Sequence, residues 1–150
     1  MTGKLFIVLA AVWLFTTGAS APVVVTPVKV TEGVYMLEHS QGSGNSTVVI
    51  TDEGVLVLDF HIENADQTLE FIRKSTDKKV KYLITSHSAG DHASGAWHFR
   101  EDAPVWIATK NQAHDLQMQE RDEFIERKNS KDPRYAAYQK GEPLTPTIAI

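Results

Sequence analysis

The sequence predicts a layered α/β domain in which helices cover a β-sheet. Short β-branched and alternating runs dominate the chain up to residue 60, and a strand–helix alternation follows them. Strands first and strand–helix units later are typical of domains that stack helices on a sheet. The length of 150 residues, with 42% hydrophobic and 23% charged residues, suits one modest globular domain.

The first elements expected along the chain are strands. They are VVVTPVKV (23–30), VYMLEH (34–39), STVVIT (46–51) and VLVLDF (55–60). Pro27 favours an edge position for the first, because proline cannot donate to a ladder. A turn cluster (41–46) separates the second from the third, and a DEG turn joins the last two into a hairpin. VLVLDF is apolar at successive positions, which predicts a central strand covered on both faces.

The hydrophobic period then changes from that of a strand to that of a helix. Within 63–75, Ala65, Leu69 and Ile72 fall on one helical face. VKYLIT (80–85) predicts another buried strand. The remaining expected elements are a short helix (96–102), a strand (104–109), a helix from Lys110 to about Lys128 that begins at a Thr109–Gln112 capping box, a short helix (132–140) and the start of a strand within 141–150.

Residues 1–21 are expected to form a secretory signal peptide. Lys4 supplies a positive charge, Leu5 to Phe15 form an apolar core, and small residues precede cleavage after Ala21 or one residue earlier. An uncleaved anchor is the alternative, although the apolar run is short for a membrane span. We therefore expect a secreted or periplasmic protein with no stable membrane span after cleavage.

Charge and cysteine content exclude several classes of function. The net charge of −4 argues against a nucleic-acid-binding protein, which would normally carry a basic face. The sequence has no cysteine, so a disulfide, a cysteine-ligated zinc and a thiol nucleophile are all excluded. Any metal must be held by histidine, aspartate or glutamate.

The segment TSHSAGDHASG (85–95) carries the strongest sign of chemistry. His87, Asp91 and His92 follow a buried strand directly, and loops at the carboxyl end of a sheet commonly build sites. Imidazole nitrogen and carboxylate oxygen are good zinc ligands. The alternative is a polar loop that only satisfies backbone groups, with Asp91 as the N-cap of a helix over 92–100.

This arrangement resembles the metallo-β-lactamase-fold hydrolases, whose signature is His-x-His-x-Asp-His after a buried strand. Here the signature reads His87-Ser88-Ala89-Gly90-Asp91-His92. GVLVLDF resembles the family's strand that ends in a buried aspartate, here Asp59, and Gly95 resembles the small residue that follows the motif. The resemblance covers roughly residues 30 to 115. It implies an αββα sandwich, of which this chain would hold the N-terminal half.

The resemblance also implies roles for individual residues. His87 would bind a first zinc ion, and Asp91 and His92 would bind a second. Asp91 would also orient the attacking water, and Asp59 would be a supporting residue. The implied activity is hydrolysis of a small-molecule substrate, such as an ester, a thioester, a lactone, a β-lactam, or a phosphate or sulfate ester.

Two departures from the family pattern bear on these roles. Ala89 has no donor atom, so the first site should be weakened. The family takes further ligands from later segments, and the last histidine, His114, is too close to the motif for that role. We therefore expect 22–150 to be the front part of a longer domain. An enzyme with one metal at Asp91 and His92, or a binding protein on the same scaffold without catalysis, are the alternatives.

The other histidines and the aromatic residues have simpler interpretations. His39 is expected at a surface or turn, and His61 is expected to be structural although it could face the cleft. His98 would lie on a different helical face from His92, and His114 would be solvated. Core positions are expected for three aromatic residues, Trp97, Phe99 and Trp106.

Overall fold

The computed structural model describes residues 23–40 and 44–150, and these contain a single mixed sheet. The expected signal peptide and positions 41–43 of the expected turn cluster lie outside the described residues. The strands are β1 (Val25–Thr31), β2 (Val34–His39), β3 (Ser46–Ile50), β4 (Val55–Leu58), β5 (Val80–Ile84), β6 (Val105–Ala108) and β7 (Ile148–Ala149). They lie side by side in the order of the sequence. The predicted strands are therefore confirmed.

The sheet is antiparallel in its first half and parallel in its second. β1 to β4 pair as successive antiparallel neighbours, and β1, which contains Pro27, is the predicted edge strand. From β4 to β7 the neighbours are parallel. Parallel neighbours need a crossover, and helices supply it here. The carboxyl ends of β4 and β5 consequently meet at one edge of the sheet.

The helices are short, and several contain 3₁₀ or π turns. They are α1 (Ala65–Ser75), α2 (Gly90–Ala93), η1 (Ala96–Asp102), α3 (Lys110–Asp115), η2 (Leu116–Glu120), α4 (Arg121–Asn129), η3 (Pro133–Tyr135) and α5 (Ala136–Gln139). The predicted capping box is present, since Thr109 Oγ1 accepts from Gln112 N and Gln112 Oε1 accepts from Thr109 N. A π turn, η2, interrupts the helix that follows. Across the described part of the chain, none of the helices has the length and apolar character needed to cross a membrane.

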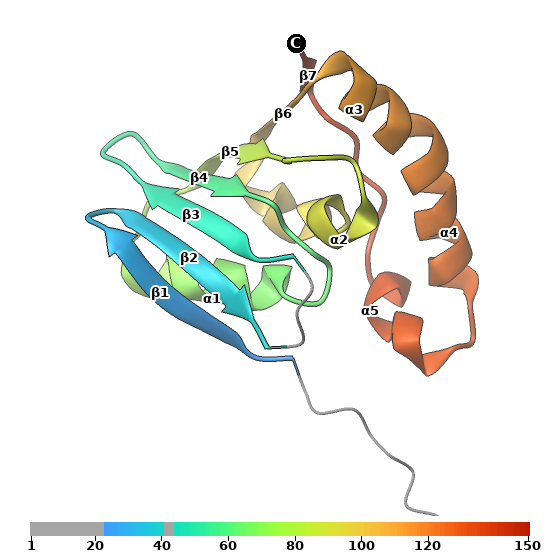
Figure 1. Ribbon diagram of the computed structural model, residues 1–150, viewed down its shortest axis with the longest axis horizontal. Helices are drawn as coiled ribbons and strands as arrows, with labels where there is room; N and C mark the ends of the chain where they lie inside the picture. Colours follow the sequence, from blue (N-terminus) through green and yellow to red (C-terminus); the bar gives the residue numbers. More distant parts are fainter. Residues whose placement is uncertain (1–22, 41–43) are drawn as a thin grey trace, which may run out of the picture.

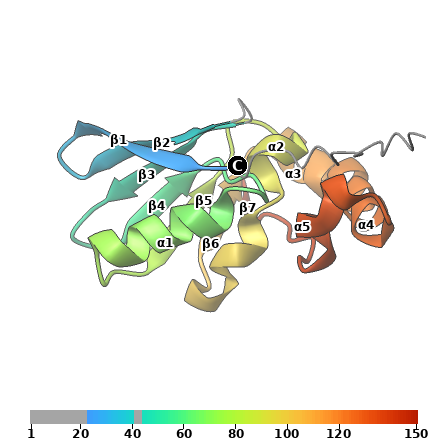
Figure 2. The same cartoon turned by 90° about the horizontal axis from the view of Figure 1, so that it is seen from below.

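Two layers make up the fold, as the sequence predicts. α1 and η1 lie against one face of the sheet, and α3 to α5 stand beside the sheet edge where α2 lies (Figures 1 and 2). Between sheet and helices lies a core that includes Leu37, Val48, Val57, Phe60, Ile72, Leu83, Phe99 and Trp106. A smaller cluster joins Ile62 to Phe124 and Tyr138. One sheet with helices on one face is half of a four-layer αββα sandwich.

The other face of the sheet is less covered than the sequence suggests. Leu56 of β4 pairs with Tyr82 of β5, and the Tyr82 side chain is 42% exposed. Val55 and Val57, which point to the opposite face, are fully buried. Covering of β4 on both faces is therefore a wrong prediction for the described residues, and β5 is likewise buried on one face only. The sequence of a strand shows which of its residues are apolar. Whether both of its faces are buried depends on which other segments pack against it.

Gly95 provides a test of how closely the segment between α2 and η1 packs against the turn after β4 and the start of α1. A methyl group there would lie 2.6 Å from Ala65 Cβ and 2.8 Å from the carbonyl oxygens of Phe60 and His61. Backbone atoms cannot move away cheaply, so Gly95→Ala should lower the free energy of unfolding by roughly 1–3 kcal/mol. Chemical denaturation measures this change. Ala103→Gly is the control at an exposed left-handed position (φ 51°) and should change stability by less than about 1 kcal/mol. Equal effects of the two exchanges would contradict the packing argument.

Candidate metal centre

The sheet edge at the ends of β4 and β5 brings the candidate residues together. Asp59 follows β4 directly, and the motif segment follows β5. The Asp59 backbone N–H donates to Ile84 O at 2.9 Å, which ties the two strand ends together. Phe60 N donates to His92 O at 2.8 Å, so α2 is fastened to the segment that contains Asp59. Residues far apart in the sequence thus share one small region.

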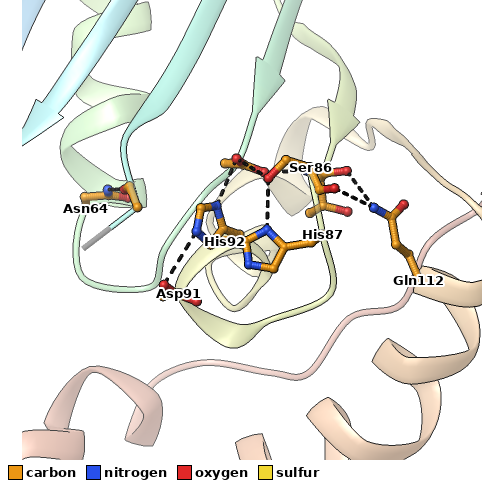
Figure 3. Close-up of polar contacts among 9 residues, drawn as sticks. Asn64, Ser86, His87, Asp91, His92 and Gln112 are labelled. Atoms are coloured by element: carbon orange, nitrogen blue, oxygen red, sulfur yellow. Dashed lines mark hydrogen bonds and ion pairs between the residues drawn. The ribbon is translucent and has the colours of Figure 1, made fainter. Parts of the chain in front are cut away.

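His87, Asp91 and His92 lie close enough to act as one set of ligands. One donor atom from each lies within 4.8 Å of the donor atoms of the other two. The two imidazole rings are 4.0 Å apart between centroids, and His92 Nε2 is 3.5 Å from Asp91 Oδ2 (Figure 3). The Asp91 side chain is 51% exposed. The three side chains therefore form an open group that solvent and small molecules can reach.

The Asp59 carboxylate holds His92 in one orientation. Asp59 Oδ1 accepts from Ser86 N at 2.7 Å, and Oδ2 accepts from Ser86 Oγ at 2.7 Å. His92 Nδ1 lies 2.9 Å from the same Oδ2. In the neutral ring, Nδ1 therefore donates to this carboxylate, and Nε2 is the nitrogen that is left to bind a metal. A ligand histidine commonly gives its second ring nitrogen to a carboxylate in this way.

Ser86 holds the imidazole ring of His87 in a similar way. Its hydroxyl proton goes to Asp59, so Ser86 Oγ accepts from His87 Nδ1 at 3.1 Å. His87 Nε2 is then also left with its lone pair. Gln112 Nε2 donates to Ser86 O at 2.8 Å and thereby holds the backbone of this loop (Figure 3). Sequence reasoning missed the site roles of Ser86 and Gln112, since only the capping pattern drew attention to Gln112.

The competing role of Asp91 as a helix cap is wrong. α2 begins at Gly90, its N-cap residue is Ala89, and no side chain makes a capping hydrogen bond. Asp91 lies within the first turn of this helix, next to His92. The group of two imidazoles and one carboxylate is a donor set that zinc accepts, so the residues fit a metal ion.

The helix from α3 to α4 packs against the back of the motif loop. Ser88 Oγ donates to Asp115 Oδ2 at 3.2 Å. A methyl group at Gly90 would lie 3.0 Å from Arg127 Nη1 and 3.1 Å from Glu120 Oε2, so these two side chains lie close against the loop. Burial, together with the charge of Glu123, raises the pKa of Glu120 above its usual value. The loop is thus confined between the sheet edge and this helix.

The remaining histidines lie partly as expected. His39 is only 6% exposed, so the prediction of a surface or turn residue is wrong: the end of β2 is covered by the turn after β4. His61 is buried too, and its burial lowers its pKa to about 4. His98 is half-buried, and burial lowers its pKa as well. Exposed His114 and buried Phe99 and Trp106 agree with the predictions, and Trp97 is half-buried.

Comparisons with known proteins identify similar sequences and folds. Residues 39–146 match the profile of the metallo-beta-lactamase superfamily. The FIM-1 metallo-beta-lactamase from Pseudomonas aeruginosa in its mono-zinc form has a TM-score of 0.51 at 20% identity, over 61% of this chain and 44% of that one. A metallo-beta-lactamase from Pontibacter korlensis has a TM-score of 0.56 at 16% identity, over 64% and 48%.

A third similar structure carries an altered motif. It is a metallo-beta-lactamase from Cronobacter sakazakii described by its HARLDQ motif, with a TM-score of 0.55 at 16% identity, over 83% of this chain and 45% of that one. The chain therefore spans less than half the length of these three proteins. No curated protein sequence gives a significant match.

Asp59→Asn tests whether the carboxylate positions the imidazoles. Asparagine tolerates the left-handed backbone at this position (φ 57°), so the chain path should be kept. An amide group cannot accept at both former oxygens, and either orientation sets its NH₂ against a donor from Ser86 or His92. We expect zinc affinity to fall roughly 10–100-fold, measured by titration against a competing chelator. Asp52→Asn, at a fully exposed side chain, is the control. Unchanged affinity in Asp59→Asn would show that the carboxylate does not act on the donors.

Proposed function

The chain belongs to the metallo-beta-lactamase superfamily, and we propose that it is a zinc-dependent hydrolase of small molecules. The observation that carries the proposal is the grouping of His87, Asp91 and His92, with donor atoms within 4.8 Å of one another. The hydrogen bonds that the Nδ1 atoms donate to Asp59 and Ser86 leave the Nε2 atoms of both imidazoles available to a metal. Esters, thioesters, lactones, β-lactams and phosphate or sulfate esters are the proposed substrate classes.

We propose that one zinc ion is held by all three side chains. In the sequence pattern, His87 belongs to a first site and Asp91 and His92 to a second, and Ala89 weakens the first. The short distances support a single ion shared by the remaining donors. The similar FIM-1 structure is described as a mono-zinc form, so one ion is compatible with this fold.

The chain's own residues supply positioning and proton handling. His87, Asp91 and His92 would hold the zinc ion, which would supply Lewis-acid activation of water and of the scissile group. Asp91, which is exposed beside His92 Nε2, accepts a hydrogen bond from the attacking water and orients it toward the substrate. Asp59 and Ser86 keep both imidazoles in the tautomer that offers Nε2. Gln112 holds the loop backbone in place during the reaction.

A binding protein without catalysis is the second candidate, and Ala89 is the observation that favours it. Ala89 removes an imidazole from the third position of the signature. The HARLDQ motif in the description of the Cronobacter sakazakii protein also lacks histidine at that position, and that protein is described as a metallo-beta-lactamase. Departure at this position is therefore compatible with membership of the lactamases, and we favour the enzyme.

We also propose that the protein acts outside the cytoplasm. The support is the sequence of residues 1–21, with Lys4 ahead of an apolar run and small residues before the expected cleavage point. A secreted or periplasmic location suits a chain without cysteine, which needs no control of thiol oxidation.

Asp91→Ala separates the enzyme from the binding protein. Metal content of the purified chain is measured by mass spectrometry, and hydrolysis is followed with a chromogenic β-lactam, a thioester, an aryl ester and an aryl phosphodiester. We expect bound zinc in the wild type, and at least a hundredfold loss of hydrolysis in the variant, because Asp91 is both ligand and water-orienting group. Asp77→Ala, at an exposed carboxylate on another surface, is the control. Trace metal in the wild type, with no hydrolysis that depends on Asp91, would end the enzyme proposal.

Ala89→His tests whether position 89, where the chain departs from the family signature, faces the metal site. A histidine there restores a donor where the family pattern has one, so zinc stoichiometry or affinity should rise. Ser88→His is the control, since it adds an imidazole at the position whose side chain contacts Asp115. The measurement is zinc titration with a chromophoric chelator. No change in bound zinc would mean that position 89 does not face the site.

A further inference from the structure

A second group of potential ligands lies beside the first, at the same end of the sheet. His39 is the last residue of β2, and His61 and Glu63 belong to the turn between β4 and α1. This turn is held by hydrogen bonds from Asn64 N and Ala65 N to His61 O, at 3.1 and 2.9 Å. We propose that His39, His61 and Glu63 form a second metal site, which takes a divalent transition-metal ion such as zinc. This proposal does not depend on the proposed hydrolase activity.

The three side chains already have the proximity that a metal site requires. One donor atom from each lies within 4.8 Å of the others. His61 Nδ1 is 4.0 Å from Glu63 Oε2, and the His39 and His61 rings are 6.0 Å apart between centroids. Ligand atoms around tetrahedral zinc lie about 3.3 Å apart, given metal–ligand bonds of about 2.0–2.1 Å. Rotation of the partly exposed Glu63 side chain and of the imidazole rings would bring the donors to this spacing.

Burial makes His61 a group that needs a partner. It is 9% exposed, and its Nδ1 atom is buried with no hydrogen-bond partner among the described residues. A buried polar atom is normally satisfied, so an orphaned imidazole nitrogen indicates a missing ligand. Burial lowers the pKa of His61 to about 4 and also lowers that of His39, which favours the neutral form of both imidazoles. Neutral imidazole is the form that binds metal.

The donor set distinguishes the class of ion. Two imidazoles and one carboxylate suit zinc and its transition-metal neighbours, whereas calcium and magnesium prefer oxygen ligands. Glu63 has a side chain that is 36% exposed, so it opens the site to solvent and leaves a position for water. The carboxylate also offsets part of the charge of the ion, which the two buried imidazoles do not.

An ion here would join two segments beside the first group of ligands. It would fix the end of β2 to the turn ahead of α1. From this turn, Asn64 Nδ2 donates to Gly44 O at 3.1 Å, and a methyl group at Gly44 would lie 3.0 Å from His92 Cε1. The second site therefore shares no ligand with the first and supports the segments that enclose His92.

The test removes the first group and counts the zinc that remains. His87→Ala with Asp91→Ala deletes two exposed ligands, and the resulting chain should still bind one zinc ion per molecule. Adding Glu63→Gln to this chain should raise the dissociation constant for zinc at least tenfold. Adding Glu53→Gln, at an exposed carboxylate in the β3–β4 turn, should leave it unchanged. Binding is measured by titration with a chromophoric chelator, and circular dichroism checks folding of each variant.

His61→Gln gives a second and stronger version of the test. It should abolish the remaining zinc binding, because it removes the buried nitrogen at the centre of the group. If this variant does not fold, the comparison of Glu63→Gln with Glu53→Gln decides the matter. The proposal is overturned if the chain without His87 and Asp91 binds no zinc, or if its affinity is the same with and without Glu63→Gln. Neither result bears on hydrolysis, so the two proposals fail separately.

Discussion

The hydrogen bonds of one carboxylate organise the whole edge of the sheet where the candidate ligands lie. Asp59 is only 8% exposed, and its two oxygens accept from a backbone N–H, a hydroxyl and an imidazole. Burial of a carboxylate is costly unless donors such as these satisfy its oxygens. These donors belong to Ser86 and His92, so the residue also joins β4 to the loop after β5. Without it, neither imidazole has a defined tautomer, and the strand ends lose a shared anchor.

Most of the fold could be predicted from local patterns in the sequence. Alternation gave the strands, the spacing of Ala65 and Ile72 gave α1, and the Thr109–Gln112 pair gave the start of α3. These features depend on neighbouring residues, so a single sequence contains them. The covering of β4 and the burial of His39 depend on which distant segments pack there. That information is absent from a strand's own composition, and both predictions were wrong.

The site divides in the same way between local and distant information. The grouping of His87, Asp91 and His92 could be predicted from their spacing in the sequence, because a four-residue helix and the residues just before it bring them together. The support from Asp59 to Ser86 spans 27 positions, and it exists because two parallel strands end side by side. Family resemblance indicated Asp59 but not Ser86 or Gln112. The group of His39, His61 and Glu63 had no recognisable spacing, since it forms only when β2 and β4 end at the same level.

The π turn η2 makes the number of residues in the helix from α3 to α4 important. A π turn holds one more residue than an α turn, so it rotates everything after it by about 100° around the helix axis. Leu116 at the start of this turn and Phe124 after it are both buried, and Arg127 contacts the Tyr138 hydroxyl. A regular α-helix through the same residues would turn Phe124 about 100° away from its cluster, whereas deletion of a single residue between 116 and 120 would restore regular α-helix and keep Phe124 facing it. The π turn thus accommodates one extra residue in this helix while Arg127, which lies against Gly90, keeps its place behind the metal loop.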